Sequence, residues 1–343
     1  MRGLSREKQC EAVARRYGSR ATSYQADGRA GFGALFYETR SVTESDADIM
    51  TRNPAMSKRA LSRYAVLASL LAMLAALVLP FAAAQAREPI SPEALVSLTG
   101  LDRALEEVAT GLAAEGARIV GQGEDVGDPE QFRTAWEHAA SESFSPTRLK
   151  EALARRIAGK LSPAELQKVE SFYTGKLGKA MVAREVAASS SAAQQEMVTG
   201  AEKLMRGLAS QPKRIVALDN LARAIRLKEV STGIALNMMR AVMIGMSATN
   251  TSKLAMPLDV IEQQVEAHRQ SAAAELEAVT ALSMAFTYRN ASVADLKAYE
   301  KFLRSPAGSH YNDVAMSGLD AVLSEGGLAF GQALARALGH TPI

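Results

Sequence analysis

Helix-start signals recur along most of this chain, and they constrain its fold more than any other feature. At several places a residue with a capping oxygen stands directly before a proline. The side chain of such a residue accepts a hydrogen bond from an unpaired N–H of the first helical turn, and proline fits the first helical position. These pairs are Ser91-Pro92, Asp128-Pro129, Ser145-Pro146, Ser162-Pro163 and Ser305-Pro306.

Apolar residues recur at helical spacing between these signals, and no stretch alternates long enough to predict a strand. Apolar residues make up 48% of the chain and aromatic residues 5%, a composition typical of alanine-rich helical proteins. We therefore predict an all-α fold of packed antiparallel helices. The expected helices cover residues 91–118, 128–141, 145–160, 162–174, 176–208, 212–249 with a break, 256–288, 292–304, 306–322 and 325–338.

The segment 56–86 has the three parts of a secretory signal peptide. A basic start is followed by an uncharged stretch over residues 64–79, and then by Ala84 and Ala86 as small residues at positions −3 and −1. We predict cleavage after Ala86 and an exported protein, either periplasmic or secreted. The alternative is an inner-membrane anchor formed by residues 64–86, since that stretch approaches the roughly 20 apolar residues that span a bilayer.

The sequence of the first 55 residues indicates neither a fold nor a signal peptide, because its apolar residues show no sustained helical spacing. Signal peptides normally stand at the N-terminus, so we expect translation to begin at Met56, or at Met50. Residues 1–55 are then absent from the natural protein or unfolded. The single cysteine, Cys10, lies in this part, which leaves the mature chain without a disulfide or a thiol nucleophile.

The positive net charge of the chain belongs mainly to its N-terminal part. Residues 1–86 hold 12 of the 40 basic residues and 7 of the 37 acidic residues, which leaves 28 basic and 30 acidic residues after position 86. The mature part therefore has a formal charge near −2 and contains no basic tract. This balance argues against nucleic acid as a partner.

An internal repeat relates two stretches of the mature part. Ser162–Arg184 aligns with Ser292–Val314 at a shift of 130 residues, with matching helix caps and apolar positions. A duplication explains these agreements better than chance does, and it predicts two related helical halves, residues 87–210 and 211–343. The identical pairs are Ser162/Ser292, Ala164/Ala294, Leu166/Leu296, Glu170/Glu300, Phe172/Phe302 and Gly178/Gly308.

Each copy predicts a helical hairpin used for packing. Its first helix is capped and presents an apolar face, which includes Leu166 and Phe172 in the first copy and Leu296 and Phe302 in the second. A tight turn follows, and the second helix carries an early glycine, Gly178 or Gly308. We expect each glycine to permit a close approach, because a Cβ there would collide with a neighbouring helix or turn.

The second copy resembles a known family. The stretch Ser292–Gly308, with Leu296, Phe302, Ser305-Pro306 and Gly308, is similar to the bacterial domain of unknown function family numbered 2059. Its signature is a helix ending in an aromatic residue, followed by Ser-Pro-x-Gly. The first copy departs at the turn, where the sequence is Thr174-Gly175-Lys176-Leu177-Gly178. The resemblance implies an all-α, usually exported protein, and it brings no assigned reaction and no catalytic residue.

The residues that carry chemistry form no recognisable catalytic, cofactor or metal pattern. The four histidines are far apart in sequence, and only His138 with Glu142 and His310 with Asp313 lie one helical turn from a carboxylate. Such pairs are usually surface interactions. No Gly-x-Ser-x-Gly or phosphate-binding loop occurs, and the Ser189–Ser191 run is more typical of a helix break or a solvent face. We therefore predict no catalytic residue, no cofactor and no metal ligand.

Methionines gather between residues 234 and 246, where Met239, Met243 and Met246 share one helical face. Core packing is the favoured interpretation, because flexible methionine side chains fill irregular gaps. An interaction face for a partner or a second copy is the first alternative. Cu(I) binding by the thioethers is the second.

Together these features favour a non-enzymatic binding or interaction module of the cell envelope. We expect its partner to be an envelope protein or a second copy of the chain, and membrane contact to involve only the uncleaved signal segment. The alternatives are a hydrolase, or a carrier of a lipid or hydrophobic peptide, with a site between the two halves. An enclosed apolar cavity would favour the carrier, and a continuous exposed apolar groove would favour the binding module. A concave pocket that holds a histidine beside a carboxylate and a hydroxyl would favour the enzyme.

Overall fold

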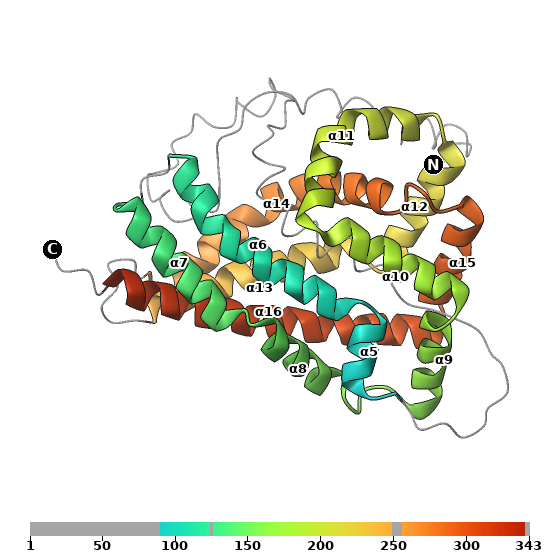
Figure 1. Cartoon of the computed structure of the whole chain (residues 1–343), viewed down its shortest axis with the longest axis horizontal. Helices are drawn as coiled ribbons and strands as arrows, with labels where there is room; N and C mark the ends of the chain where they lie inside the picture. Colours follow the sequence, from blue (N-terminus) through green and yellow to red (C-terminus); the bar gives the residue numbers. More distant parts are fainter. Residues whose placement is uncertain (1–89, 124–125, 249–255, 340–343) are drawn as a thin grey trace.

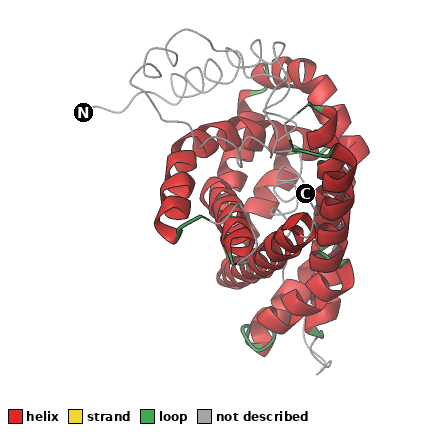
Figure 2. Ribbon diagram, turned by 90° about the vertical axis from the view of Figure 1, so that its left-hand side faces the viewer, coloured by secondary structure: helices red, strands yellow, loops and turns green. Residues whose placement is uncertain are grey.

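The computed structural model describes residues 90–123, 126–248 and 256–339. These residues form twelve α-helices and no β-strand, so the predicted all-α fold is confirmed (Figure 1 and Figure 2). The predicted signal peptide over residues 56–86 and the segment 1–55 lie outside the described residues. In the described ranges, no helix combines the length and the apolar character needed to span a bilayer.

The helices follow one another with short connections. Their bounds are α5 (Pro92–Leu98), α6 (Leu101–Gly121), α7 (Pro129–Ser143), α8 (Pro146–Ile157), α9 (Pro163–Tyr173), α10 (Lys176–Ser189), α11 (Ser191–Ala209), α12 (Pro212–Ala224), α13 (Leu227–Ser247), α14 (Leu258–Thr287), α15 (Val293–Leu303) and α16 (Pro306–Gly339). All five predicted capping residues stand directly before a proline that begins a helix. Four of their side chains accept a hydrogen bond from a backbone N–H of the first turn, whereas the side chain of Ser145 accepts none within the described ranges.

Three of the expected helices are divided in the structure. The helix expected over 91–118 is interrupted at Gly100, whose φ of 75° is a left-handed conformation that glycine adopts easily. The helix expected over 176–208 breaks at Ser190, whose side chain accepts a hydrogen bond from Ala193 N and caps α11. The break predicted within 212–249 occurs before α13, at Arg226, whose φ is 50°.

The predicted interruption between residues 322 and 325 is wrong, because α16 continues through it. Gly326 and Gly327 lie inside the helix and are buried. A Cβ on Gly326 would stand 3.0 Å from the Phe144 ring, and one on Gly327 would stand 3.1 Å from Met238 O. These glycines therefore serve close helix packing and do not end the helix.

The long helix α16 is the axis of the molecule, with α13 along one side and α7, α8 and α9 along others (Figure 1). The crossing of α13 and α16 depends on glycine from both helices. A Cβ on Gly245 would stand 2.2 Å from Leu328 O, and one on Gly331 would stand 2.2 Å from Val242 O. The two backbones therefore approach more closely than side chains would permit.

The main hydrophobic core contains residues from before and after position 210. Its largest fully buried side chains include Trp136 and Phe144 from the earlier part and Tyr299 and Phe330 from the later part. Two smaller clusters lie between α10, α11 and α14, and between α13 and α14. The division into halves at residue 210 stays a prediction.

The two hairpins of the sequence repeat, α9–α10 and α15–α16, have the same local construction. Ser162 with Glu165 and Ser292 with Asp295 each form a capping box. After each turn, the early glycine of the second helix lies against the preceding aromatic residue: a Cβ on Gly178 would stand 2.2 Å from Phe172 O. The equivalent distance at the second hairpin, from Gly308 to Phe302 O, is 2.1 Å.

The hairpins also face each other in a reciprocal way, because α9 contacts α16 and α10 contacts α15. The Phe172 and Phe302 rings stack between them, with centroids 5.0 Å apart and an interplanar angle of 7°. At one edge of this contact, His310 Nδ1 lies 2.8 Å from Glu165 Oε1. Two similar units related by a local two-fold axis would make contacts of this kind.

Candidate functional site

The residues singled out by the repeat form a packing interface. Phe172, Gly178, Leu296, Phe302 and Gly308 are buried, while Leu166 and Ser305 are half-buried and Pro306 is exposed at the start of α16. The Ser305 hydroxyl accepts a hydrogen bond from Gly308 N at 3.1 Å and so caps α16. Phe172 and Phe302 therefore pack between the two hairpins, whereas Gly178, Gly308 and Ser305 stabilise the turn within their own hairpin.

The methionine face of α13 is covered by other helices of the chain. Met239 and Met243 belong to the small cluster between α13 and α14, with Ile261 and Val265, and Met246 belongs to the main core. All three are at most 8% exposed. Packing, the favoured interpretation, accounts for their positions.

The histidine–carboxylate pairs lie at the surface. His138 is 3.8 Å from Glu142, and the His138 side chain is 71% exposed. His310 and Asp313, the other pair one helical turn apart, have different partners: His310 contacts Glu165, and Asp313 accepts a hydrogen bond from Arg226. Within the ranges that the structure describes, no group of three or more His, Cys, Asp or Glu side chains could hold a metal ion.

A shallow hollow at the start of α7 includes His138, Asp128, Glu130 and Thr134 among its lining residues. Its carboxylates already have partners. Asp128 Oδ1 accepts hydrogen bonds from two backbone N–H groups and caps α7, and Glu130 is paired with Arg133. The hollow therefore offers no unoccupied carboxylate to orient the histidine as a general base.

A fully buried carboxyl group, Glu185 on α10, is a feature that sequence reasoning missed. It is 1% exposed and lies where α10, α14 and α15 meet. The hydroxyls of Tyr288 and Tyr299 both donate to Glu185 Oε1, at 2.6 and 3.0 Å. Glu185 Oε2 and the hydroxyl of Tyr173 have no hydrogen-bond partner within the described structure.

Burial raises the pKa of the Glu185 carboxyl to about 8, although the two tyrosine hydrogen bonds act in the opposite direction. The carboxyl therefore carries its proton at neutral pH in the folded protein. The pKa values of Tyr288 and Tyr299 are raised as well, first by burial and then by the nearby carboxyl. This cluster is a neutral hydrogen-bonded network inside the core.

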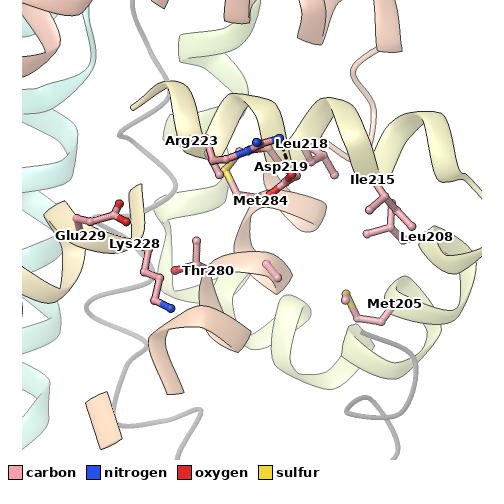
Figure 3. A pocket seen from close by; sticks show the side chains of 12 residues that line it. Met205, Leu208, Ile215, Leu218, Asp219, Arg223, Lys228, Glu229, Thr280 and Met284 are labelled. Atoms are coloured by element: carbon pink, nitrogen blue, oxygen red, sulfur yellow. Dashed lines mark hydrogen bonds and ion pairs between the residues drawn. The ribbon is translucent and has the colours of Figure 1, made fainter. Parts of the chain in front are cut away.

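A concave site with open apolar surface lies between α11, α12, α13 and α14 (Figure 3). We call this cavity of about 220 Å³ the apolar pocket. Local sequence sets two of its walls. Pro212 begins α12 directly after the turn that follows α11, and the left-handed residue Arg226 turns the chain between α12 and α13.

The floor of the apolar pocket consists of hydrophobic side chains from three helices. Ile215, Leu218 and Met284 are buried there, and half-buried apolar residues complete the wall. Figure 3 shows the apolar side chains of Met205, Leu208 and Ile215 at one end of the space and Lys228 and Glu229 at the other. The apolar residues of the lining are Met205, Leu208, Ile215, Leu218, Ala222, Ala281 and Met284.

Thr280 places one unpartnered polar group in this wall. It is 7% exposed, it lines the pocket, and its hydroxyl oxygen has no hydrogen-bond partner in the described structure. A helical threonine usually bonds to a carbonyl of the preceding turn. An unsatisfied buried hydroxyl costs about 1–3 kcal/mol. The oxygen has almost no accessible surface, so it offers no hydrogen bond to a ligand in the pocket.

The charged rim of the apolar pocket is balanced. Asp219 and Arg223 form an ion pair one helical turn apart, with 2.8 Å between Arg223 Nη2 and Asp219 Oδ2. Lys228 and Glu229 add one charge of each sign at the start of α13. The rim therefore has no net charge that would select an anion or a cation.

Comparisons of the chain with protein-family models, curated proteins and solved structures found no match in any of the three. The similarity of Ser292–Gly308 to family 2059 therefore stays a prediction. The apolar pocket has only a weak signal in the sequence, the spacing of Ile215, Leu218 and Ala222 along one face of a helix. That spacing predicts a buried face, and only the arrangement of the neighbouring helices leaves part of it uncovered.

Proposed function

We propose that this chain is an exported, non-enzymatic binding protein of the cell envelope that carries a small apolar molecule in the apolar pocket. The observation that carries the proposal is the apolar lining of the pocket, whose floor is formed by the buried side chains of Ile215, Leu218 and Met284. Small-molecule sites typically join predominantly apolar walls with a few placed polar groups. Export rests on the signal features of residues 56–86.

The position of the pocket supports the carrier over the protein-binding module. One wall comes from α11, before the predicted boundary at residue 210, and the others come from α12, α13 and α14, after it. In the described ranges, the exposed large hydrophobic side chains are Val216 and Leu258, which lie on different helices. The pocket therefore has more contiguous apolar surface than either Val216 or Leu258 exposes.

The cavity volume suits a linear chain better than a bulky ring system. At about 220 Å³ it lies below the range of roughly 300–1,000 Å³ that holds a drug-sized ligand. We expect an unbranched alkyl group to fit between Met205, Leu218 and Met284.

Binding of straight-chain alcohols to the purified full chain tests this proposal. Isothermal titration calorimetry with a series of 1-alkanols should give one saturable site. The affinity should rise about fourfold for each added methylene until the pocket is full, since burying a methylene contributes about 0.8 kcal/mol. The largest alkanols should gain nothing further.

A pocket-filling variant provides the specific control. Ala222→Phe adds a ring at the half-buried wall and should abolish alkanol binding. Val216→Phe places the same ring on the exposed side of α12 and should leave binding unchanged. Absence of saturable binding, or equal binding by wild type and Ala222→Phe with both folded, would show that the pocket is not the site.

A further inference from the structure

A second recess adjoins the apolar pocket. It has a volume of about 430 Å³ and lies between α11 and the C-terminal part of α14, with the start of α12 at its edge. Its charged lining residues are Lys203, Arg214, Arg289 and Glu196. Three cations against one carboxylate give this recess a net positive charge. We call it the basic recess.

Two of the three cations are held in place by the chain itself. Arg214 is half-buried and donates to the carbonyls of Tyr288 and Ala291, the second at 2.9 Å from Nη1. Arg289 stacks on the Phe286 ring, with its guanidinium carbon 3.8 Å from the ring centroid. Preorganised guanidinium groups at a partly dehydrated site bind carboxylate and phosphate well, because little side-chain entropy is lost.

The basic recess and the apolar pocket share part of a wall. Leu208 lines both cavities. On each of three helices, a residue of one cavity is the chain neighbour of a residue of the other, as the pairs Leu204/Met205, Arg214/Ile215 and Met284/Ala285 show. A molecule with an apolar end and an anionic end could therefore occupy both cavities across Leu208.

We propose that the ligand is a single-chain amphiphile whose alkyl chain fills the apolar pocket and whose anionic headgroup, a phosphate or carboxylate, binds at Lys203, Arg214 and Arg289. This inference rests on the proposed function. The charge distribution supports the placement of the headgroup. The rim at Lys228 and Glu229 is balanced, whereas the recess beyond Leu208 has an excess of two positive charges.

Glu196 is the one acidic residue in the recess lining and would compete with the headgroup. Its Oε2 lies 3.5 Å from Arg289 Nη2, and its side chain is 62% exposed. An exposed ion pair at this distance is weak, so a bound anion can replace the carboxylate at little cost. Removing the charge of Glu196 should therefore strengthen the binding of an anionic ligand and leave a neutral one unaffected.

The test compares 1-decanol, decyl phosphate and inorganic phosphate on the full chain, by calorimetry below the concentration at which the amphiphile forms micelles. We expect decyl phosphate to bind roughly tenfold or more tightly than 1-decanol, with an advantage that shrinks between about 0.05 M and about 0.5 M salt. Lys203→Gln should weaken decyl phosphate binding about three- to fivefold, and Glu196→Gln should strengthen it by a similar factor. Neither substitution should change 1-decanol binding.

Matched controls change the same charges on nearby surfaces. Lys213→Gln on α12 and Glu202→Gln on α11, where Glu202 pairs with Arg206, remove charges outside the recess lining and should have little effect. Equal affinities for 1-decanol and decyl phosphate would overturn the headgroup site while the proposed function stands. Inorganic phosphate binding as tightly as decyl phosphate would overturn the amphiphile as the ligand. Failure of both decyl compounds to bind would overturn the proposed function itself.

Discussion

Replacing the buried carboxyl of Glu185 by an amide should change how the stability of this protein depends on pH. Glu185→Gln keeps an acceptor oxygen for the hydroxyls of Tyr288 and Tyr299, which donate to one carboxyl oxygen at 2.6 and 3.0 Å. The amide nitrogen takes the place of the oxygen that has no partner in the described structure. The substitution therefore removes a titrating group with little change of shape.

The direction of this pH effect follows from the pKa of the carboxyl in the unfolded and in the folded chain. In the unfolded chain it releases its proton near its ordinary pKa of 4.5, whereas burial raises the pKa in the folded protein to about 8. The contribution of Glu185 to stability is therefore fully present below pH 4.5 and is lost as the pH rises toward 8. At about 1.4 kcal/mol for each pH unit, the total loss is roughly 5 kcal/mol.

Urea unfolding followed by circular dichroism at several pH values measures this effect. The stability of Glu185→Gln relative to wild type should rise by about 4 kcal/mol between pH 4.5 and pH 8. If the unpaired amide destabilises the variant, it does so equally at pH 4.5 and at pH 8, so the change in relative stability between the two pH values stays the same. Glu202→Gln on the surface of α11 serves as the control. Parallel pH profiles for wild type and Glu185→Gln would refute the buried, protonated state.

Three further predictions concern packing and processing. Phe302→Ala should lower the free energy of unfolding by about 3–5 kcal/mol, because the ring is 9% exposed and stacks on Phe172; equal thermal midpoints would contradict this. Gly245→Ala should destabilise the folded protein, because its Cβ would stand 2.2 Å from a backbone oxygen. Gly233→Ala in the same helix meets nothing within 4 Å and should stabilise the protein by up to about 1 kcal/mol. Thermal unfolding of the two variants tests this difference. N-terminal sequencing of protein secreted by its host should begin at residue 87, and a start before Tyr64 would exclude cleavage there.

Local sequence determined where helices begin and how each hairpin turns. The helix starts at Ser91, Asp128, Ser145, Ser162 and Ser305 are correct. All of these side chains except Ser145 accept a hydrogen bond from a backbone N–H, and a cap and the N–H groups it serves lie within about four residues of each other. The early glycines of the two hairpins were recognised for the same reason, because the backbone oxygen they approach is only six residues away in the chain. Periodicity likewise predicted the burial of the aromatic residues in these hairpins.

Only the tertiary structure showed which segments that are distant in sequence contact each other. An interruption is predicted between residues 322 and 325, but α16 continues through it, and the buried Gly326 and Gly327 provide room for Phe144 and α13. Glu185 lies on the buried face of α10, but the partners of its carboxyl could not be read from the local sequence, because Tyr288 and Tyr299 are more than 100 residues away.

The candidate site also depends on contacts between segments that are distant in sequence. Whether the face of α12 that carries Ile215 and Leu218 is covered or left open depends on the packing of α11 and α14 against it. The same packing sets Arg214 and Arg289 beside Leu208. Helix formation is governed by contacts within a turn, whereas a pocket is the space left between helices, and its shape depends on all of them at once.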